Sequence, residues 1–243
     1  MTHSVRLIVL LTIKYSDTSL LVYAYTNLFG RQTYILRGIR TAKKHSAAAH
    51  FFPLHILEAQ VYHKTGASIH HIKEFHTDNP LLGIRTHLHK SAIALFLGEV
   101  LYKTIKEEEP NETLFHFLTG AIFELDLLTQ VVANFHLYFL AQLNIHLGFA
   151  PLINFHPQHA PVFDIQKGHF DSIGKSTGPI FSVETSALFY RLCTASNASE
   201  AASIAMNGVQ RRLIIDAIVQ YLSFHLNTPL VFKSPEVLQQ VLQ

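Results

Sequence analysis

The chain has 243 residues, of which 49% are hydrophobic, and a formal net charge of +2 at pH 7. This apolar content is enough to bury a core and excludes a disordered chain, while the length fits one large domain or two small ones. The single cysteine, Cys193, excludes a disulfide within the chain and a zinc site made of several thiolates.

The first part of the chain carries the pattern of short β-strands. Stretches rich in β-branched and aromatic residues alternate with turn-like segments such as SDTS and NLFG. Five strands within so short a length predict a small closed barrel, and the OB-fold is the commonest barrel with that number of strands. The five predicted strands lie within residues 5–15, 20–26, 31–40, 50–63 and 68–75.

The start of the chain and its most apolar stretch both argue against export and membrane insertion. The run Leu7–Leu11 has no cationic segment before it and no small-residue cleavage site after it, so it is a poor signal peptide. Residues 114–150 are strongly apolar but are interrupted by charged and polar side chains, which favours buried helices. With one cysteine in the chain, we expect a cytoplasmic protein.

The second part of the chain has helical periodicity, which begins after the break TDNPLLG at 77–83. Residues 151–182 lose this periodicity and collect Pro, Gly, His and Asp. The sequence therefore predicts an α+β protein with a barrel domain at 1–78 and a helical domain at 79–243, the latter with an irregular insert at about 151–182. Near the end of the chain, Ser234 is the expected N-cap of a helix that has Pro235 at its first position.

Charge is divided unevenly between these predicted domains. Residues 1–78 hold nine Lys or Arg and four Asp or Glu, whereas residues 79–243 hold ten and thirteen. A basic first domain predicts a polyanionic partner, with cations on phosphates and tyrosines stacked on unpaired bases. The alternative is that the cations form a solvated edge and the tyrosines fill the barrel. The residues that we predict to bind DNA are Lys14, Arg31, Tyr34, Arg37, Arg40, Lys43 and Lys44.

Catalysis has little support in the sequence. We find no zinc-protease H-E-x-x-H and no G-x-x-x-x-G-K-[ST] phosphate loop. Glu124 and Asp126 are two residues apart on a predicted helix, so they point to different faces and do not form an acid–base pair. Cys193 lies on an apolar helix face and is better explained as a buried thiol than as a nucleophile. A small-molecule hydrolase is disfavoured because we identify no nucleophile beside a base.

Several segments, taken in order, resemble the bacterial recombination mediator family RecO. The stretch YSDTSLLVYAYTNLFGRQTYILRGIR resembles the family's N-terminal barrel, and FLGEVLYKTIKEEEPNETLF resembles its first long helix with the acidic break after it. YFLAQLNIHLGFAP resembles a helix that ends in Leu-Gly-Phe-x-Pro, and RRLIIDAIVQYLSFHL with KSPEVL resembles the C-terminal helix and the Lys-Ser pair. The resemblance covers nearly the whole chain.

This resemblance implies a non-enzymatic DNA repair and recombination protein of the RecF pathway, without a cofactor and associated with the bacterial nucleoid. Proteins of the family bind single- and double-stranded DNA, anneal complementary strands and engage the acidic C-terminal tail of single-strand DNA-binding protein (SSB). With RecR they help to load RecA onto coated single strands. Cations near predicted helix ends are the candidates to bind the SSB tail: Arg85, Lys90, Arg211 and Arg212.

The insert departs from the family pattern. Many RecO relatives hold a four-cysteine zinc ribbon after Leu-Gly-Phe-x-Pro, and this insert has no cysteine. We therefore expect a degenerate, metal-free, ribbon-like hairpin, although His156, His159, His169 and Asp164 leave open a mixed nitrogen and oxygen site. A second alternative also stays open for the whole chain, namely a helical interaction scaffold whose barrel binds protein rather than DNA.

Overall fold

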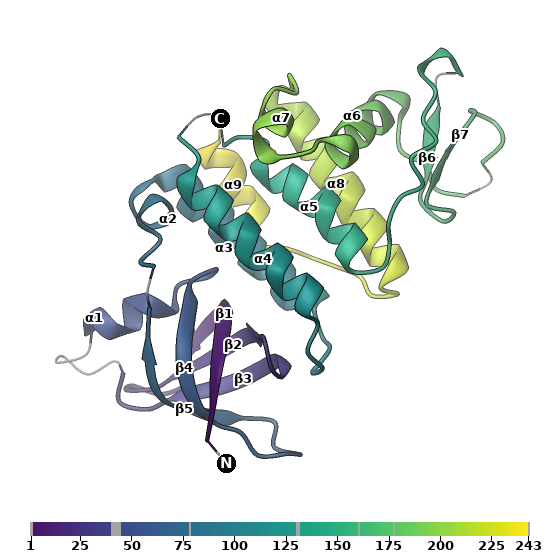
Figure 1. Ribbon diagram of the computed structural model, residues 1–243. Helices are drawn as coiled ribbons and strands as arrows, with labels where there is room; N and C mark the ends of the chain where they lie inside the picture. The colour runs from purple at the N-terminus through teal and green to yellow at the C-terminus, as the bar shows by residue number, and fades with distance from the viewer. Residues whose placement is uncertain are drawn as a thin grey trace. The chain divides into compact units, whose positions relative to one another are not determined.

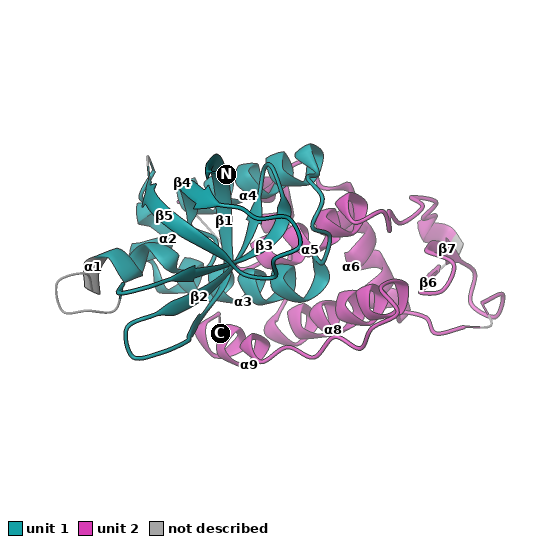
Figure 2. Cartoon of the chain, turned by 90° about the horizontal axis from the view of Figure 1, so that it is seen from below, with its two compact units in different colours: residues 1–127 teal, residues 128–243 magenta. Residues whose placement is uncertain are grey.

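The computed structural model describes residues 2–39, 45–77, 79–129, 132–159, 161–176 and 178–242. The chain forms two compact units, which we call the barrel unit (residues 1–127) and the helical unit (residues 128–243) (Figure 2). The first two long helices, at residues 88–104 and 112–127, thus belong to the same unit as the barrel, although the sequence pattern changes at residue 78. The domain boundary predicted there stays a prediction.

The barrel unit begins with a closed five-stranded barrel, as the sequence predicted (Figure 1). Its hydrogen-bonded order is β1-β2-β3-β5-β4, and the pairing of β3 with β5 is parallel, which is the OB-like arrangement. Alternate residues of β1, such as Val5, Leu7 and Val9, point into the core. The strands are β1 (Thr2–Lys14), β2 (Leu20–Thr26), β3 (Gly30–Leu36), β4 (Ile56–Tyr62) and β5 (His70–His76).

Short helical turns connect β3 to β4, and three helices follow β5. Gly98 lets α3 approach the barrel closely, because a Cβ there would lie 2.7 Å from both the Leu10 carbonyl oxygen and the Pro53 Cβ. The side chain of Asn111 caps the start of α4, because its Oδ1 accepts a hydrogen bond from the Leu114 amide at 2.9 Å. These elements are α1 (His45–Ala48), η2 (Ala49–Phe51), α2 (Leu82–Thr86), α3 (Leu88–Thr104) and α4 (Glu112–Leu127).

The helical unit is built around α5 and α8, with a small hairpin formed by the insert. The ring of Phe163 on the hairpin lies 4.9 to 5.2 Å, between centroids, from four other aromatic rings that belong to Phe170, Phe181, Phe189 and Tyr221. The elements are α5 (Phe135–His146), η3 (Pro157–His159), β6 (Val162–Asp164), β7 (His169–Asp171), α6 (Val183–Thr194), α7 (Ala198–Ala202), α8 (Gly208–His225) and α9 (Ser234–Val241).

The N-termini of α8 and α9 are capped in different ways. Asn207 caps α8 through a capping box with Gln210. In α9, Ser234 is already the first helical residue and Lys233 takes the cap position, so the predicted N-cap is displaced by one residue. A shift of this size is common at helix ends, where fraying makes the boundary soft.

Candidate functional site

Two predicted DNA-binding cations, Lys14 and Arg37, lie at one end of the barrel. Lys14 is paired with Leu20 across β1 and β2, and Leu20 is paired with Leu36 across β2 and β3. Arg37 follows Leu36 and is exposed, and the Lys14 side chain is 57% exposed with its Nζ 3.0 Å from Asp17 Oδ1. Both cations therefore face solvent at the same end. The predicted residues Arg40, Lys43 and Lys44 lie outside the described residues.

Arg31 lies at the start of β3, and its side chain contacts the segment that follows α3, while its predicted contact with DNA stays a prediction. Its Nη1 donates a hydrogen bond to the Ile105 carbonyl at 3.0 Å, and its guanidinium lies 4.6 Å from the centre of the Tyr102 ring. Lys106 Nζ lies 5.4 Å from the same ring, and partial burial, followed by the charge of Arg31, lowers the pKa of Lys106. Arg31 therefore holds the segment after α3 against the barrel. Tyr102 and Lys106 were not foreseen, because they come from a segment remote in sequence.

The structure corrects the stacking role expected for Tyr34. Its ring is 0% exposed and belongs to the barrel core, and this burial raises the pKa of the hydroxyl. Tyr25 is also buried, at 1% exposure. Tyr34 therefore fills the barrel, which was the alternative explanation, whereas Tyr25 lies on the outer face of β2, with its ring centroid 6.2 Å from that of Phe115 on α4. Neither buried ring offers a face to a base.

The cations predicted to bind the SSB tail fall in two different units. Arg85 is exposed on α2 of the barrel unit, and Arg211 and Arg212 lie on α8 of the helical unit. Lys90 is 95% buried, and its Nζ donates a hydrogen bond to the Asp126 carbonyl at 2.6 Å. Lys90 thus fixes the end of α4, and its expected place on the rim of a binding groove is corrected.

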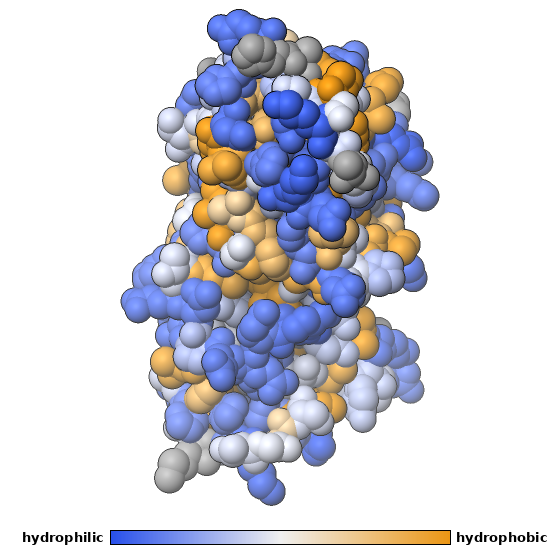
Figure 3. Space-filling view, turned by 90° about the vertical axis from the view of Figure 1, so that its right-hand side faces the viewer, coloured by the Kyte–Doolittle hydropathy of each residue, from blue (hydrophilic) through white to orange (hydrophobic). Residues whose placement is uncertain are grey.

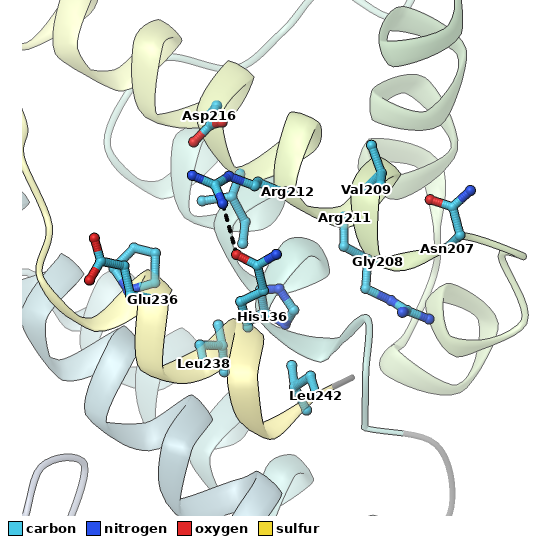
Figure 4. A pocket seen from close by; sticks show the side chains of 13 residues that line it. His136, Asn207, Gly208, Val209, Arg211, Arg212, Asp216, Glu236, Leu238 and Leu242 are labelled. Atoms are coloured by element: carbon cyan, nitrogen blue, oxygen red, sulfur yellow. Dashed lines mark hydrogen bonds between the residues drawn. The ribbon is translucent and has the colours of Figure 1, made fainter.

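An apolar groove lies between α8 and α9 within the helical unit (Figure 4). Its volume is about 320 Å³, and Val209, Ile215 and Leu238 contribute to its walls. Arg212 Nη1 donates to Gln239 Oε1 at 2.9 Å, so this guanidinium bridges the two helices at the groove (Figure 4).

Arg211 and His136 are tied to the interior behind this groove. Arg211 Nε donates to Asn134 Oδ1 at 2.9 Å, and Asn134 Nδ2 in turn donates to the Ala201 and Ile204 carbonyls at 3.0 and 2.8 Å. Burial, together with the charge of Arg211, lowers the pKa of His136 to about 3. The exposed charged side chains that line the groove are therefore the guanidinium of Arg212 and the carboxylates of Asp216 and Glu236, and the neutral imidazole of His136 lies behind them.

The insert holds a hydrogen-bonded carboxylate. Asp164 is 0% exposed and accepts hydrogen bonds from Ser176 Oγ at 2.5 Å and from the Lys167 amide at 2.9 Å. Burial alone would raise the pKa of Asp164, but these bonds and the charge of Lys167 hold it below its usual value. His156 is exposed, His169 Nε2 lies 3.8 Å from Asp171 Oδ2, and the His159 side chain is outside the described part. Among the described residues, no cluster of three or more His, Cys, Asp or Glu could hold a metal ion.

The same insert contains a hydrolase-like spacing that the sequence reasoning overlooked. Residues 174–178 read GKSTG, which matches the G-x-S-x-G pattern of a nucleophile elbow. That motif requires a strand before it and a helix after it, but turn residues lead into Ser176 here. The Ser176 hydroxyl donates to Asp164 rather than to a histidine. The segment therefore lacks the context and the base of a hydrolase site.

Cys193 on α6 behaves as the sequence predicted for a structural thiol. Burial raises the pKa of the thiol, which disfavours the reactive thiolate.

In the described residues no helix is long and apolar enough to cross a membrane. On the face shown in Figure 3, hydrophilic and hydrophobic side chains are interspersed.

Comparison with known proteins accounts for both parts of the chain. The family profile described as Recombination protein O N terminal matches residues 1–80, and the profile Recombination protein O C terminal matches residues 85–232. DNA repair protein RecO of Flavobacterium psychrophilum is 33% identical over 97% of each chain, and that of Porphyromonas gingivalis is 29% identical over 96% of each chain. DNA repair protein RecO of Bacteroides fragilis is 40% identical, but the match spans only 56% of either chain. The chain belongs to the RecO family of DNA repair proteins.

Proposed function

We propose that this protein is a recombination mediator that binds single- and double-stranded DNA and anneals complementary strands. With RecR, it would help to load RecA onto single strands coated with SSB. These finer roles come from the resemblance to the RecO family, and the observation that carries them is the match of both family profiles along the chain. We further propose that it does this without catalysis and in the bacterial cytoplasm.

The proposed DNA surface is the end of the barrel that carries Lys14 and Arg37. The chain continues from Arg37 into the segment with Arg40, Lys43 and Lys44, so four cations are close in sequence, and Lys14 lies at the same end of the barrel as Arg37. Cations of this kind contact phosphates and give affinity without sequence discrimination. A mediator that must act at any single-stranded gap needs that property.

The salt dependence of DNA binding tests this surface. Replacing Arg37, Arg40, Lys43 and Lys44 by alanine should weaken binding and reduce the slope of log K against log salt by about 0.9 per lost phosphate contact on duplex DNA. A control variant that loses two exposed cations of the helical unit, Lys175 and Arg191, should keep the wild-type slope. An unchanged slope in the fourfold variant would refute the proposed surface. Failure of the wild-type protein to shift DNA at low salt would favour the protein-binding scaffold instead.

We also propose that the groove between α8 and α9 receives the SSB tail. A short acidic and hydrophobic peptide needs an apolar pocket for its anchor side chain and a cation for its carboxylates. The groove has both, with Val209 and Leu238 on its walls and Arg212 at its edge. Arg211 is less suited to this role because it is only partly exposed and its Nε is held by the buried Asn134, whereas Arg212 is exposed.

A labelled peptide with the chemistry of the SSB tail tests the groove through fluorescence anisotropy with the full chain. Arg212→Gln should weaken binding about tenfold or more, since a charge-assisted hydrogen bond contributes about 1.5–3 kcal/mol and every 1.4 kcal/mol is about tenfold in affinity. Arg191→Gln, which removes an exposed arginine on α6, is the matched control and should bind like wild type. Equal affinity of Arg212→Gln and wild type would place the tail elsewhere.

A further inference from the structure

A stack of three rings stands beside the loop that joins β4 to β5. Phe29 comes from the β2–β3 turn, His63 from the end of β4 and His70 from the start of β5. The centroids of Phe29 and His63 are 3.9 Å apart with planes at 5°, and those of His63 and His70 are 4.3 Å apart with planes at 20°. His3 meets the edge of Phe29 at 5.2 Å. We call Phe29, His63 and His70 the ring stack.

The ring stack holds the β4–β5 loop in one conformation. Within the loop, the Lys64 amide donates to His70 Nδ1 at 3.4 Å, and the Ala67 amide donates to the Lys64 carbonyl at 3.1 Å. Because His70 Nδ1 accepts a hydrogen bond, it carries no proton. Partial burial, followed by the charge of the neighbouring imidazole, lowers the pKa of both His63 and His70, which agrees with a neutral stack. The loop is therefore pre-organised before any ligand arrives.

Next to the stack, the loop encloses an open hollow of about 910 Å³. Tyr62 and Ile69, which line it, are 49% and 40% exposed. Lys64 and His71 are exposed at the same place, and none of the described residues that line the hollow is acidic. An exposed aromatic ring, an apolar side chain and an ammonium group thus share one concave surface without opposing charge.

We propose that this hollow binds one unpaired nucleotide of single-stranded DNA. The base would lie on the Tyr62 ring against Ile69, and the phosphate would meet Lys64. Stacking on an aromatic ring beside a cation is how proteins hold single strands without reading sequence, and the β4–β5 loop of an OB-fold is a common position for oligonucleotides. A paired base in a duplex already has both faces covered, so the hollow favours single strands.

The hollow is separate from the cationic end of the barrel. Thr2 pairs with Tyr62 at one end of β1, whereas Lys14 is the other end of the same strand, roughly 40 Å of extended chain away. The inference rests on the proposed DNA binding. The hollow is proposed to bind a base, however, whereas the cationic end of the barrel is proposed to bind phosphates. Measurements that remove bases and keep phosphates therefore separate the two.

The test uses the full chain and two labelled oligonucleotides of equal length, one of thymidylate and one with an abasic site at every position. Wild type should bind the thymidylate at least about fivefold more tightly, the lower end of what a single base stack contributes. Tyr62→Ala should lose this preference and keep its affinity for the abasic strand, while Tyr62→Phe should retain it. Phe224→Ala, which removes a ring that is 45% exposed on α8, is the matched control.

The following outcomes would contradict the proposed base-binding role of the hollow. Equal affinity of wild type for both strands would overturn the inference and leave the proposed DNA binding intact, whereas binding to neither would overturn both. An equal loss of affinity for both strands in Tyr62→Ala, in a variant with the wild-type circular dichroism spectrum and melting temperature, would reduce Tyr62 to a structural role. If a chelator abolished the preference for thymidylate over the abasic strand, a metal ion bound by the histidines of the hollow, rather than stacking on Tyr62, would explain that preference, and the proposal would be overturned. Photocrosslinking with iodouracil should place adducts on Tyr62 or the β4–β5 loop, and adducts confined to other segments would contradict the proposal.

Discussion

Replacing His136 by glutamine should make the helical unit less sensitive to acid. His136 lies on α5 and is 1% exposed, and burial holds its pKa at about 3 in the folded chain against an ordinary value of 6.5. At a pH between these two pKa values, the His136 imidazole is protonated in the unfolded chain and neutral in the folded chain. Stability therefore falls as the pH drops below about 6.5, and the loss continues until the folded pKa is reached.

The size of this effect follows from proton linkage. With pKa values of 6.5 unfolded and about 3 folded, His136 costs about 2 kcal/mol of unfolding free energy on going from pH 7 to pH 5. The side chain is almost fully buried, so solvent does not screen this cost. Glutamine does not titrate and keeps a polar side chain of similar size, so the variant should lose about 2 kcal/mol less than wild type over this interval.

Urea unfolding followed by circular dichroism at the two pH values measures the difference. Other histidines with lowered pKa, such as His55, contribute equally to wild type and variant, so the double difference isolates His136. His89→Gln, which removes an exposed histidine of the barrel unit, tests whether the loss of any histidine has this effect. Equal pH dependence in wild type and His136→Gln would refute the reasoning.

Three further outcomes are expected. Asp164→Ala should destabilise the helical unit by roughly 1–3 kcal/mol, because it removes a buried carboxylate that accepts hydrogen bonds from the Ser176 hydroxyl and the Lys167 amide. In wild type this stabilisation should be lost as the pH falls below about 4, and thermal unfolding measured at several pH values checks both expectations. Gly30→Ala should lower the melting temperature sharply, since φ is +57° and a Cβ would meet the Glu107 carbonyl at 2.6 Å, whereas Gly120→Ala, with open space around it, should not. Elemental analysis of untagged, dialysed protein should find no stoichiometric zinc, and one zinc per chain would contradict the prediction of a metal-free insert.

Local patterns in the sequence were sufficient for the elements of the fold. Stretches rich in β-branched and aromatic residues are separated by turn residues, so the five-stranded barrel could be predicted without tertiary information. In the segment YFLAQLNIHLGFAP, Gly148 and Pro151 likewise indicate the end of a helix, and α5 ends at His146. These signals work because backbone geometry, which is local, sets both the side-chain period and the sites where a helix must end.

The tertiary structure alone decided which side chains are available for function. The period of β3 places Tyr34 on one face, but only barrel closure shows that this face is the interior. The sequence predicts Lys90 to be a solvated cation, but in the folded chain its Nζ donates a hydrogen bond to the Asp126 carbonyl at the end of α4. The ring stack joins Phe29, His63 and His70 from three strand ends, and no sequence spacing encodes that contact. Periodicity describes one element at a time, whereas burial and the meeting of side chains depend on how distant elements pack.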